Sequence, residues 1–178
     1  MNDVTGTHRE EPLRSLTVES PIGALKVIAS GAGMRAILWP DDEPDRVALR
    51  HEIEDVGLDE PVLAEAAQQL TQYFVGERTV FDLPLDPAGT AFQLQAWQAL
   101  RSIPFGTTVS YAEQAEQMGD RRKARAVGAA NGRNPLSIVV PCHRVVGSNG
   151  SLTGFAGGTD AKRWLLHHEA RVAGLTLL

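Results

Sequence analysis

A short segment rich in proline and glycine, residues 82–89, divides the chain into two halves with different residue patterns. Before it, residues 16–39 alternate between apolar and polar side chains, with turn-forming residues at 20–23 and 31–33. This alternation predicts a three-stranded antiparallel meander. After the segment, apolar residues recur every three or four positions, which is the spacing of helices. The sequence therefore predicts an α/β protein of the α+β kind, in which a small antiparallel-sheet amino-terminal domain precedes a mainly helical carboxy-terminal domain.

We expect three parts along the chain: a flexible tail over residues 1–14, an amino-terminal α/β domain over 15–88 and a second domain over 89–178. The tail is polar and lacks the apolar core of a signal peptide. No apolar run in the chain is long enough to cross a bilayer. These features predict a cytoplasmic protein with no membrane partner.

Charge is distributed unevenly between the two halves. Residues 1–90 carry 7 Lys and Arg against 17 Asp and Glu, a net charge of −10, whereas residues 91–178 carry 10 against 5, a net charge of +5. The basic residues between Gly119 and Gly147 are Arg121, Arg122, Lys123, Arg125, Arg133 and Arg144. This asymmetry indicates a basic working surface beside an acidic domain, although an ordinary solvated surface would explain the same charges equally well.

Two amphipathic helices are expected on either side of the dividing segment. The first runs from Pro61 to a stop at Gly76. Its apolar face comprises Leu63, Ala66, Ala67, Leu70 and Phe74. Thr90 can cap the second helix. Its apolar face comprises Phe92, Ala96, Ala99, Leu100 and Ile103.

A helix-turn-helix is expected further along the chain. Ser110 and Glu113 form the S-x-x-E pattern of a capping box, which opens a short helix that ends at Gly119. A turn and a second helix over residues 123–131 complete the outline. Most residues of that helix are small: Ala124, Ala126, Gly128, Ala129 and Ala130. Small residues let another surface approach closely, whether a ligand or a neighbouring helix.

The only cysteine of the chain, Cys142, lies in an apolar, β-branched stretch and is followed by His143. A cysteine reacts as its thiolate, so a nearby histidine oriented by a third group is the usual activator. Neighbours on an extended chain point to opposite sides, so proton transfer between these two residues needs a turn or a bridging water. Glu169, His167 and His168 are the candidates for the third group. From these facts alone, a buried structural cysteine is the more common situation.

A glycine-rich loop over residues 147–158 follows and matches no phosphate-binding motif. The last helix is expected over residues 159–170. Thr159 or Asp160 is the expected N-cap of this helix.

Five blocks of the second half, in this order, resemble the O6-alkylguanine-DNA alkyltransferases (methylated-DNA–protein-cysteine methyltransferases). They are "GTAFQLQAWQAL", "IPFGTTVSYAEQA", "ARAVGAANGRNP", "VVPCHRVVGSNGSLTGFAGG" and "KRWLLHHE". The resemblance covers about half of the chain, residues 89–169, and the first half matches only through "SPIG" and its strand pattern. It implies a ribonuclease-H-like fold for the amino-terminal domain and a DNA-binding, alkyl-accepting domain over 89–178.

The resemblance also implies an activity in DNA repair. The protein would transfer an alkyl group, stoichiometrically and irreversibly, from O6-alkylguanine or O4-alkylthymine in double-stranded DNA to its own Cys142. It would use a minor-groove helix-turn-helix and nucleotide flipping. It would need no cofactor and no metal, and it would act as a monomer, compatible with cooperative assembly on DNA.

The family's motifs give roles to individual residues. Cys142 would accept the alkyl group, with His143 acting as its base through water and Glu169 orienting the imidazole. Tyr111 would donate a proton to N3 of the leaving guanine, and Asn134 would connect the helix-turn-helix to the active-site segment.

Further residues of the motifs imply contacts with DNA and with the damaged base. Arg125 would fill the gap left by the flipped nucleotide. The other implied DNA contacts are Ser110, Tyr111, Arg121, Ala124, Ala126 and Gly128. The implied guanine pocket comprises Pro141, Val145, Phe155, Ala156 and Gly157.

The sequence departs from some relatives in two ways. Some relatives carry tyrosine and serine where this chain has Phe155 and Ala156, a change that costs little if the loop binds guanine through backbone N–H groups. Relatives with zinc in the first domain use cysteines that this chain lacks, so we expect no structural zinc.

Two other functions compete with alkyl transfer. A cysteine hydrolase built on Cys142, His143 and Glu169 would turn over, whereas a thioether on Cys142 is a poor leaving group. A binding-only module, like the alkyltransferase-like proteins, would lack the acceptor cysteine, which this chain keeps.

Overall fold

A four-stranded sheet forms the first half of the structure, a computed structural model that describes residues 11–175. In the order β3-β2-β1-β4, the strands are β1 (Leu13–Val18), β2 (Leu25–Ser30), β3 (Gly33–Leu38) and β4 (Ile53–Asp55). The pairs β1–β2 and β2–β3 are antiparallel, which confirms the predicted meander. The first strand begins at Leu13 rather than Leu16, so the predicted tail over 1–14 extends too far; residues 1–10 of that tail lie outside the described residues.

The fourth strand was not expected from the sequence. It pairs in parallel with β1, with Ile53 opposite Leu13. Only three residues long, it has two exposed side chains, Glu54 and Asp55. So short a strand at a sheet edge gives no alternating pattern that a sequence could show.

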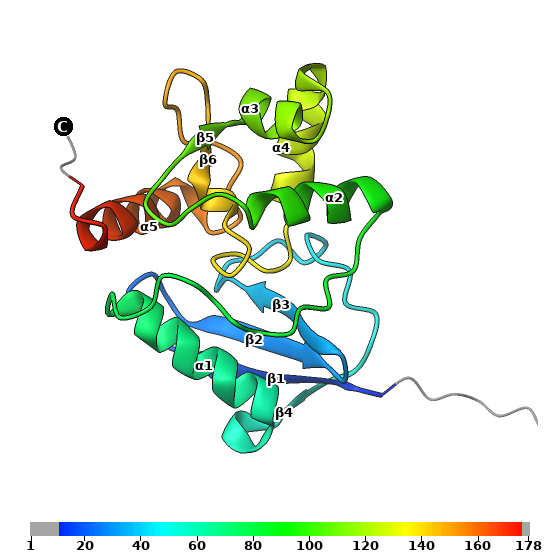
Figure 1. Cartoon of the computed structure of the whole chain (residues 1–178). Coiled ribbons are helices and arrows are strands. Elements are labelled where there is room, and N and C mark those ends of the chain that lie inside the picture. The colour runs from blue at the N-terminus through cyan, green and yellow to red at the C-terminus, as the bar shows by residue number, and fades with distance from the viewer. Residues whose placement is uncertain (1–10, 176–178) are drawn as a thin grey trace, which may run out of the picture.

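Helix α1 (Pro61–Phe74) covers one face of the sheet (Figure 1), after a 3₁₀ turn, η1 (Gly57–Asp59). Pro61 occupies the first helical position, where its missing N–H costs nothing. The buried side chains of α1 are Leu63, Ala66, Gln69, Leu70, Tyr73 and Phe74. The predicted apolar face is thus confirmed apart from Ala67, which is only half-buried. Gly76 follows the helix with a φ of 82°, a left-handed conformation that suits glycine.

The second half is mainly helical, which confirms the predicted fold class. Its helices are α2 (Ala91–Leu100), α3 (Tyr111–Gln117), α4 (Ala124–Gly132) and α5 (Gly158–Val172). The remaining elements are the 3₁₀ turns η2 (Arg121–Lys123) and η3 (Cys142–Arg144) and the paired strands β5 (Val109–Ser110) and β6 (Val145–Val146). Within residues 11–175, no helix is both long and apolar enough to cross a membrane.

The predicted cap at Thr90 and the predicted capping box at Ser110 are both confirmed, and the structure shows that Thr90 also forms a capping box. The Thr90 hydroxyl accepts the Gln93 backbone N–H at 3.2 Å, and the Ser110 hydroxyl accepts that of Glu113 at 3.2 Å. In return, the Glu113 carboxylate accepts the Ser110 N–H at 2.6 Å. These reciprocal bonds satisfy donors that a helix leaves free at its first turn.

The predicted N-cap of α5 is wrong. The helix begins at Gly158, so Thr159 and Asp160 already lie in its first turn, and Gly157 at the N-cap position provides no side-chain cap. The chain enters the helix through a tight turn, in which the Gly158 N–H donates to the Phe155 carbonyl at 3.0 Å. Backbone turn geometry therefore replaces the side-chain cap.

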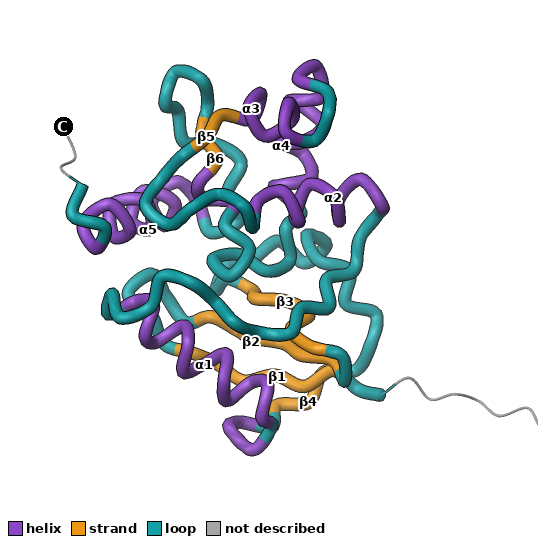
Figure 2. Tube along the Cα trace, in the orientation of Figure 1, coloured by secondary structure: helices purple, strands orange, loops and turns teal. Residues whose placement is uncertain are grey.

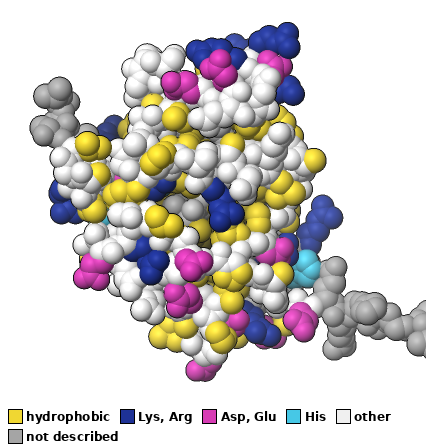
Figure 3. Space-filling model, in the orientation of Figure 1, with side chains coloured by type: hydrophobic (Ala, Val, Ile, Leu, Met, Phe, Trp, Pro, Cys, Tyr) yellow, Lys and Arg dark blue, Asp and Glu magenta, His cyan; other side chains and the backbone are white. Residues whose placement is uncertain are grey.

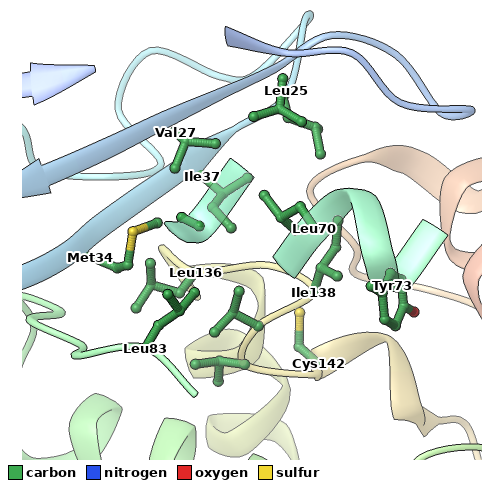
Figure 4. Packing of buried hydrophobic residues seen from close by; sticks show 14 of the residues in the cluster. Leu25, Val27, Met34, Ile37, Leu70, Tyr73, Leu83, Leu136, Ile138 and Cys142 are labelled. Atoms are coloured by element: carbon green, nitrogen blue, oxygen red, sulfur yellow. The ribbon is translucent and has the colours of Figure 1, made fainter. Parts of the chain in front are cut away.

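One hydrophobic core joins the two halves. Figure 4 shows sheet residues such as Val27 and Ile37, together with Leu70 of α1, facing Leu136 and Cys142 of the segment that follows α4. Figure 2 shows this segment mostly as loop, lying between the sheet and the helices of the second half. The buried segment that carries Cys142 therefore lies at the junction of the two halves.

Candidate active site

Cys142 begins the turn η3 and lies within the common core, with only 5% of its surface exposed. Burial raises the pKa of its thiol, whereas hydrogen bonding by Asn134 and the charges of Lys162 and Arg46 act in the opposite direction. The net shift keeps the thiol protonated in the resting protein. A reaction at this sulfur therefore needs a base to accept the proton.

His143 lies in the same turn and is fully buried. The turn expected between Cys142 and His143 is present, because both residues belong to η3 and are not part of an extended strand. The imidazole Nε2 lies 2.6 Å from Oε1 of Glu169. The other ring nitrogen, Nδ1, is buried and has no hydrogen bond to another group of the described residues. Burial lowers the pKa of His143 and Glu169 offsets only part of this, so the imidazole is neutral near pH 7 and has a lone pair to accept a proton.

The carboxylate of Glu169 is the centre of a buried polar network. Besides His143, Oε1 accepts hydrogen bonds from the Tyr73 hydroxyl at 2.8 Å and from Arg144 at 3.0 Å. Oε2 accepts the Gly106 N–H at 3.0 Å and Arg144 Nε at 2.9 Å. Burial acts to raise the pKa of Glu169, but the hydrogen bonds and charges of His143 and Arg144 outweigh burial and hold it below its ordinary value. A permanently charged carboxylate therefore fixes the His143 ring.

Of the three candidates for the orienting group, only Glu169 reaches His143. His167 is exposed. His168 is buried elsewhere, where it bonds the Tyr73 carbonyl at 2.7 Å and stacks on Trp164 with a centroid distance of 4.8 Å. Successive residues of a helix point in different directions, so only one of the three can face the site.

Arg144 differs from its sequence-based interpretation. The sequence groups it with the basic residues of the helix-turn-helix, but in the structure it is buried. Its guanidinium donates two hydrogen bonds to Glu169 and one, at 2.6 Å, to the Ile103 carbonyl. Its charge balances the buried carboxylate and is unavailable to an external phosphate.

Tyr111, at the start of α3, lies beside the glycine-rich loop. Its hydroxyl donates to the Thr153 carbonyl at 3.0 Å. Burial raises the pKa of Tyr111, so the phenol stays protonated. Lys162 of α5, fully buried, lies 3.5 Å from the same hydroxyl and donates to the carbonyls of Val145 at 2.6 Å and Thr153 at 3.1 Å. Lys162 of α5 thus binds both β6, which directly follows η3, and the glycine-rich loop.

Asn134 shapes the segment between α4 and Cys142. Its amide donates to the Val140 carbonyl at 2.8 Å, and its side-chain oxygen accepts the Leu136 N–H at 3.0 Å. Inside this turn, Ile138 has a φ of 77°, which is rare for a β-branched residue. The Asn134 carbonyl also accepts from Arg46, a buried arginine of the first half. These contacts fix where the chain delivers Cys142.

Helices α3 and α4 pack together as the predicted helix-turn-helix. Gln114 and Asn131 exchange buried side-chain hydrogen bonds at 2.7 and 3.2 Å. Arg125, Ala126 and Ala129 are exposed on α4, and Ala124 and Gly128 are partly exposed. A Cβ at Gly128 would lie 3.5 Å from the Tyr111 ring. The small residues thus serve both an exposed surface and a close approach to Tyr111.

Basic side chains gather at the end of the molecule that carries α3 and α4, with acidic side chains beside them (Figure 3). Arg121 is exposed and lies 2.9 Å from Glu116, and exposed Arg122 lies 2.9 Å from Asp120. Exposed ion pairs of this kind contribute little to stability, so these arginines can change partners readily.

The residues of the expected guanine pocket lie partly at the surface and partly in the core. Phe155 and Ala156 line a surface pocket of about 430 Å³, together with residues of the loop after β3. Phe155 packs edge to face on Trp39, with 5.3 Å between the ring centroids. Gly157 lies so close to the same indole that an added Cβ would be 2.7 Å from it, which leaves no room for a side chain. Pro141 and Val145 are buried. The described residues contain no cluster of His, Cys, Asp and Glu side chains that could hold a metal ion.

Three residues of the network were missed by the sequence analysis: Tyr73, Lys162 and Arg46. Tyr73 lies on the apolar face of α1 and gives no polar signal, while Lys162 and Arg46 lie in charged stretches typical of a surface. Each acquires its partner only through a contact between distant parts of the chain.

Comparisons with known proteins match almost the whole described chain. The family model described as "6-O-methylguanine DNA methyltransferase, ribonuclease-like domain" matches residues 13–87. That described as "6-O-methylguanine DNA methyltransferase, DNA binding domain" matches residues 91–171.

Similar proteins carry a consistent name. A methylated-DNA–protein-cysteine methyltransferase of Mycolicibacterium paratuberculosis is 46% identical over 165 residues, which cover 90% of this chain and 96% of that protein. The protein of the same name from Salmonella typhimurium is 46% identical over 161 residues, 85% of this chain and 92% of the relative.

Solved structures agree with the sequence matches. The crystal structure of Mycobacterium tuberculosis OGT in complex with DNA superposes with a TM-score of 0.80 at 42% identity, covering 91% of this chain and 94% of that one. The Mycobacterium tuberculosis O6-methylguanine methyltransferase has a TM-score of 0.77 at 43% identity, covering 89% and 93%. The chain therefore belongs to the 6-O-methylguanine DNA methyltransferase family, the methylated-DNA–protein-cysteine methyltransferases.

Proposed function

We propose that this protein repairs double-stranded DNA by moving an alkyl group from O6 of guanine to its own Cys142, once per molecule. The observation that carries the proposal is the buried set of Cys142, His143 and Glu169, in which His143 Nδ1 has no hydrogen bond to another group of the described residues. The same reaction would remove alkyl groups from O4 of thymine. In keeping with the family models, we divide the chain into a ribonuclease-H-like domain that begins with β1 at Leu13 and extends to residue 88, and an acceptor domain over 89–178.

The reaction begins with a proton transfer. His143 Nδ1 accepts the Cys142 proton through a bridging water, and Glu169 stabilises the resulting imidazolium. The thiolate attacks the alkyl carbon, a carbon–sulfur bond forms and the carbon–oxygen bond breaks. The electron pair of that bond leaves with guanine. The thioether is a poor leaving group, so the protein is spent after one event.

The leaving guanine needs a proton, and Tyr111 is placed to give one. Its hydroxyl lies beside the loop at Thr153, and its raised pKa keeps it protonated. To reach N3 of guanine, the hydroxyl turns away from the Thr153 carbonyl. Backbone groups at Val145 and in the loop over 154–158 bind the edge of the base.

DNA binds through the helix-turn-helix, with α4 in the minor groove. Because Ala124, Ala126 and Gly128 lack bulk, the backbone of α4 can approach the sugars closely. Ser110, Tyr111 and Arg121 contact the flanking backbone, and Asn134 transmits the position of α4 to the Cys142 segment.

Counting repair events tests the proposal directly. A duplex that contains O6-methylguanine, in excess over the protein, should yield one restored guanine per protein molecule. More than one restored guanine per molecule would contradict the single-use mechanism and favour a hydrolase. No restored guanine would contradict alkyl transfer altogether.

Arg125→Ala should slow the repair of duplex DNA far more than the reaction with free O6-benzylguanine, because only the duplex requires the nucleotide to be flipped out. Arg125 is an exposed, long cationic residue on a helix of small ones. Stopped-flow rates on both substrates measure the difference. Arg163→Ala, at an exposed arginine of α5, is the control and should change neither rate. Equal losses on both substrates in Arg125→Ala would indicate a structural role.

Binding to DNA should weaken with salt. Of the six basic residues between Gly119 and Gly147, five are exposed in the structure: Arg121, Arg122, Lys123, Arg125 and Arg133. If about three contact phosphates, the logarithm of the affinity should fall with that of the salt concentration with a slope near −3, about −0.9 per contact.

Reversing the charges of Arg121 and Arg122 to glutamate should flatten the salt dependence without changing the reaction of free O6-benzylguanine. The control reverses Arg14 and Lys26, exposed residues of the sheet, for the same change in net charge. Fluorescence anisotropy at several salt concentrations gives the slopes. A steep slope that survives in the first variant would exclude this surface as the DNA-binding site.

A further inference from the structure

Tyr73 connects the first half of the chain to the proposed relay. The residue lies near the end of α1, within the range that matches the ribonuclease-like domain, and it is fully buried. Its hydroxyl donates to Glu169 Oε1 at 2.8 Å. The same oxygen lies 2.6 Å from His143 Nε2. Two residues from different halves of the chain thus share one carboxylate oxygen.

The Tyr73 side chain is held so that its hydroxyl donates its proton to Glu169. Burial raises its pKa well above the ordinary value, and the charge and hydrogen bond of Glu169 raise it further. Its ring packs against those of Phe81 and Phe105, with distances between ring centroids of 5.4 and 6.1 Å. Its backbone carbonyl bonds His168 at 2.7 Å. The phenol therefore stays protonated and presents its proton to Glu169.

We propose that Tyr73 is a positioning residue that moderates His143 as a base through the oxygen they share, a role that rests on the proposed function. A hydrogen bond from Tyr73 withdraws negative charge from Oε1, and less charge remains to stabilise the imidazolium. Without the hydroxyl, His143 would bind its proton more tightly.

Other groups around His143 act on it as well. Arg144 of η3 and Lys162 of α5 lower its pKa through their charges, Glu169 raises it, and burial lowers it most. Cys142 is its neighbour in η3. Tyr73 is the residue through which α1 influences the pKa of His143, and it carries no charge of its own. A tyrosine-to-phenylalanine change there removes one hydrogen bond and leaves every charge in place.

The test is Tyr73→Phe, read by the NMR titration of the His143 imidazole in the free protein and by the pH profile of alkyl transfer. Losing a hydrogen bond to a charged group should raise the His143 midpoint by about one pH unit. The acidic limb of the rate profile should move by the same amount, with the plateau rate changed less than about threefold. A midpoint that moves by less than about a tenth of this shift would overturn the proposal.

Phe81→Leu is the matched control, because it loosens the packing of the Tyr73 ring but leaves its hydroxyl on Glu169. Its midpoint should equal that of the unmodified protein, and a shift equal to that of Tyr73→Phe would attribute the effect to packing. Replacing Tyr73 with 3-fluorotyrosine, a stronger hydrogen-bond donor, should lower the His143 midpoint. This replacement provides the test if Tyr73→Phe does not fold. The titration needs no DNA. An unmodified protein that accepts no alkyl group would therefore contradict the proposed function, and the titration would still decide on Tyr73.

Discussion

Cys142→Ala is expected to abolish the uptake of methyl groups and to leave DNA binding nearly intact. Cys142 is the only thiol of the chain, so no other residue can form the thioether. The side chain is buried in the core that joins the two halves, so its loss removes no exposed contact to DNA. Transfer of a radioactive methyl group from DNA to protein, together with a binding curve on the same duplex, measures both effects.

Two outcomes would count against this expectation. Methyl transfer that persists in Cys142→Ala would eliminate the cysteine as acceptor. A large loss of DNA affinity would show that Cys142 also supports the binding surface, as a structural core residue would. Cys142→Ser keeps a similar shape and so separates the role of acceptor from the role of core residue. This variant should bind DNA but should not take up the methyl group.

Glu169→Gln should slow alkyl transfer by an order of magnitude or more, which is the usual effect of losing acid–base assistance. The apparent pKa of Cys142 should rise, because His143 loses the charge that stabilises its protonated form. Rates from pH 5 to 9 measure both changes. An unchanged profile would remove Glu169 from the relay. Asp160→Asn, at an exposed carboxylate of the same helix, is the control and should leave the profile as it is.

The same substitution should also reduce stability, by about 3–5 kcal/mol, because it leaves the buried charge of Arg144 uncompensated. The native pKa of Glu169 is depressed, so its contribution to stability is present above the pKa of the unfolded chain, near 4.3, and is lost as the pH falls below it. Urea unfolding at pH 7 and pH 3 should therefore show a smaller difference between Glu169→Gln and the unmodified protein at the lower pH.

Local sequence signals predicted much of the fold. The meander, the cap at Thr90, the capping box at Ser110 and the glycine stop at Gly76 all depend on neighbouring residues, and all are confirmed. Strand β4 and the N-cap of α5 were missed or wrong, because tertiary pairing and turn geometry determine them rather than a residue pattern.

The candidate site divides in the same way. Cys142, His143 and Glu169 could be named from motifs, and the structure brings the last two within 2.6 Å. The donors that complete the network could not be named. Tyr73 resembles any other residue of an apolar helix face, and Lys162 any other surface lysine, until the chain folds and each meets a partner far away in sequence. Arg144 shows the converse error, since a basic residue in a basic stretch is buried and neutralised by Glu169.

Mass spectrometry of the protein after incubation with O6-methylguanine DNA tests the central claim most directly. The account predicts that the peptide containing Cys142 gains the mass of one methyl group in place of a hydrogen, in one copy per protein molecule, while the guanine is restored. An unmodified Cys142 peptide alongside restored guanine, or a methyl group on any other peptide, would contradict it.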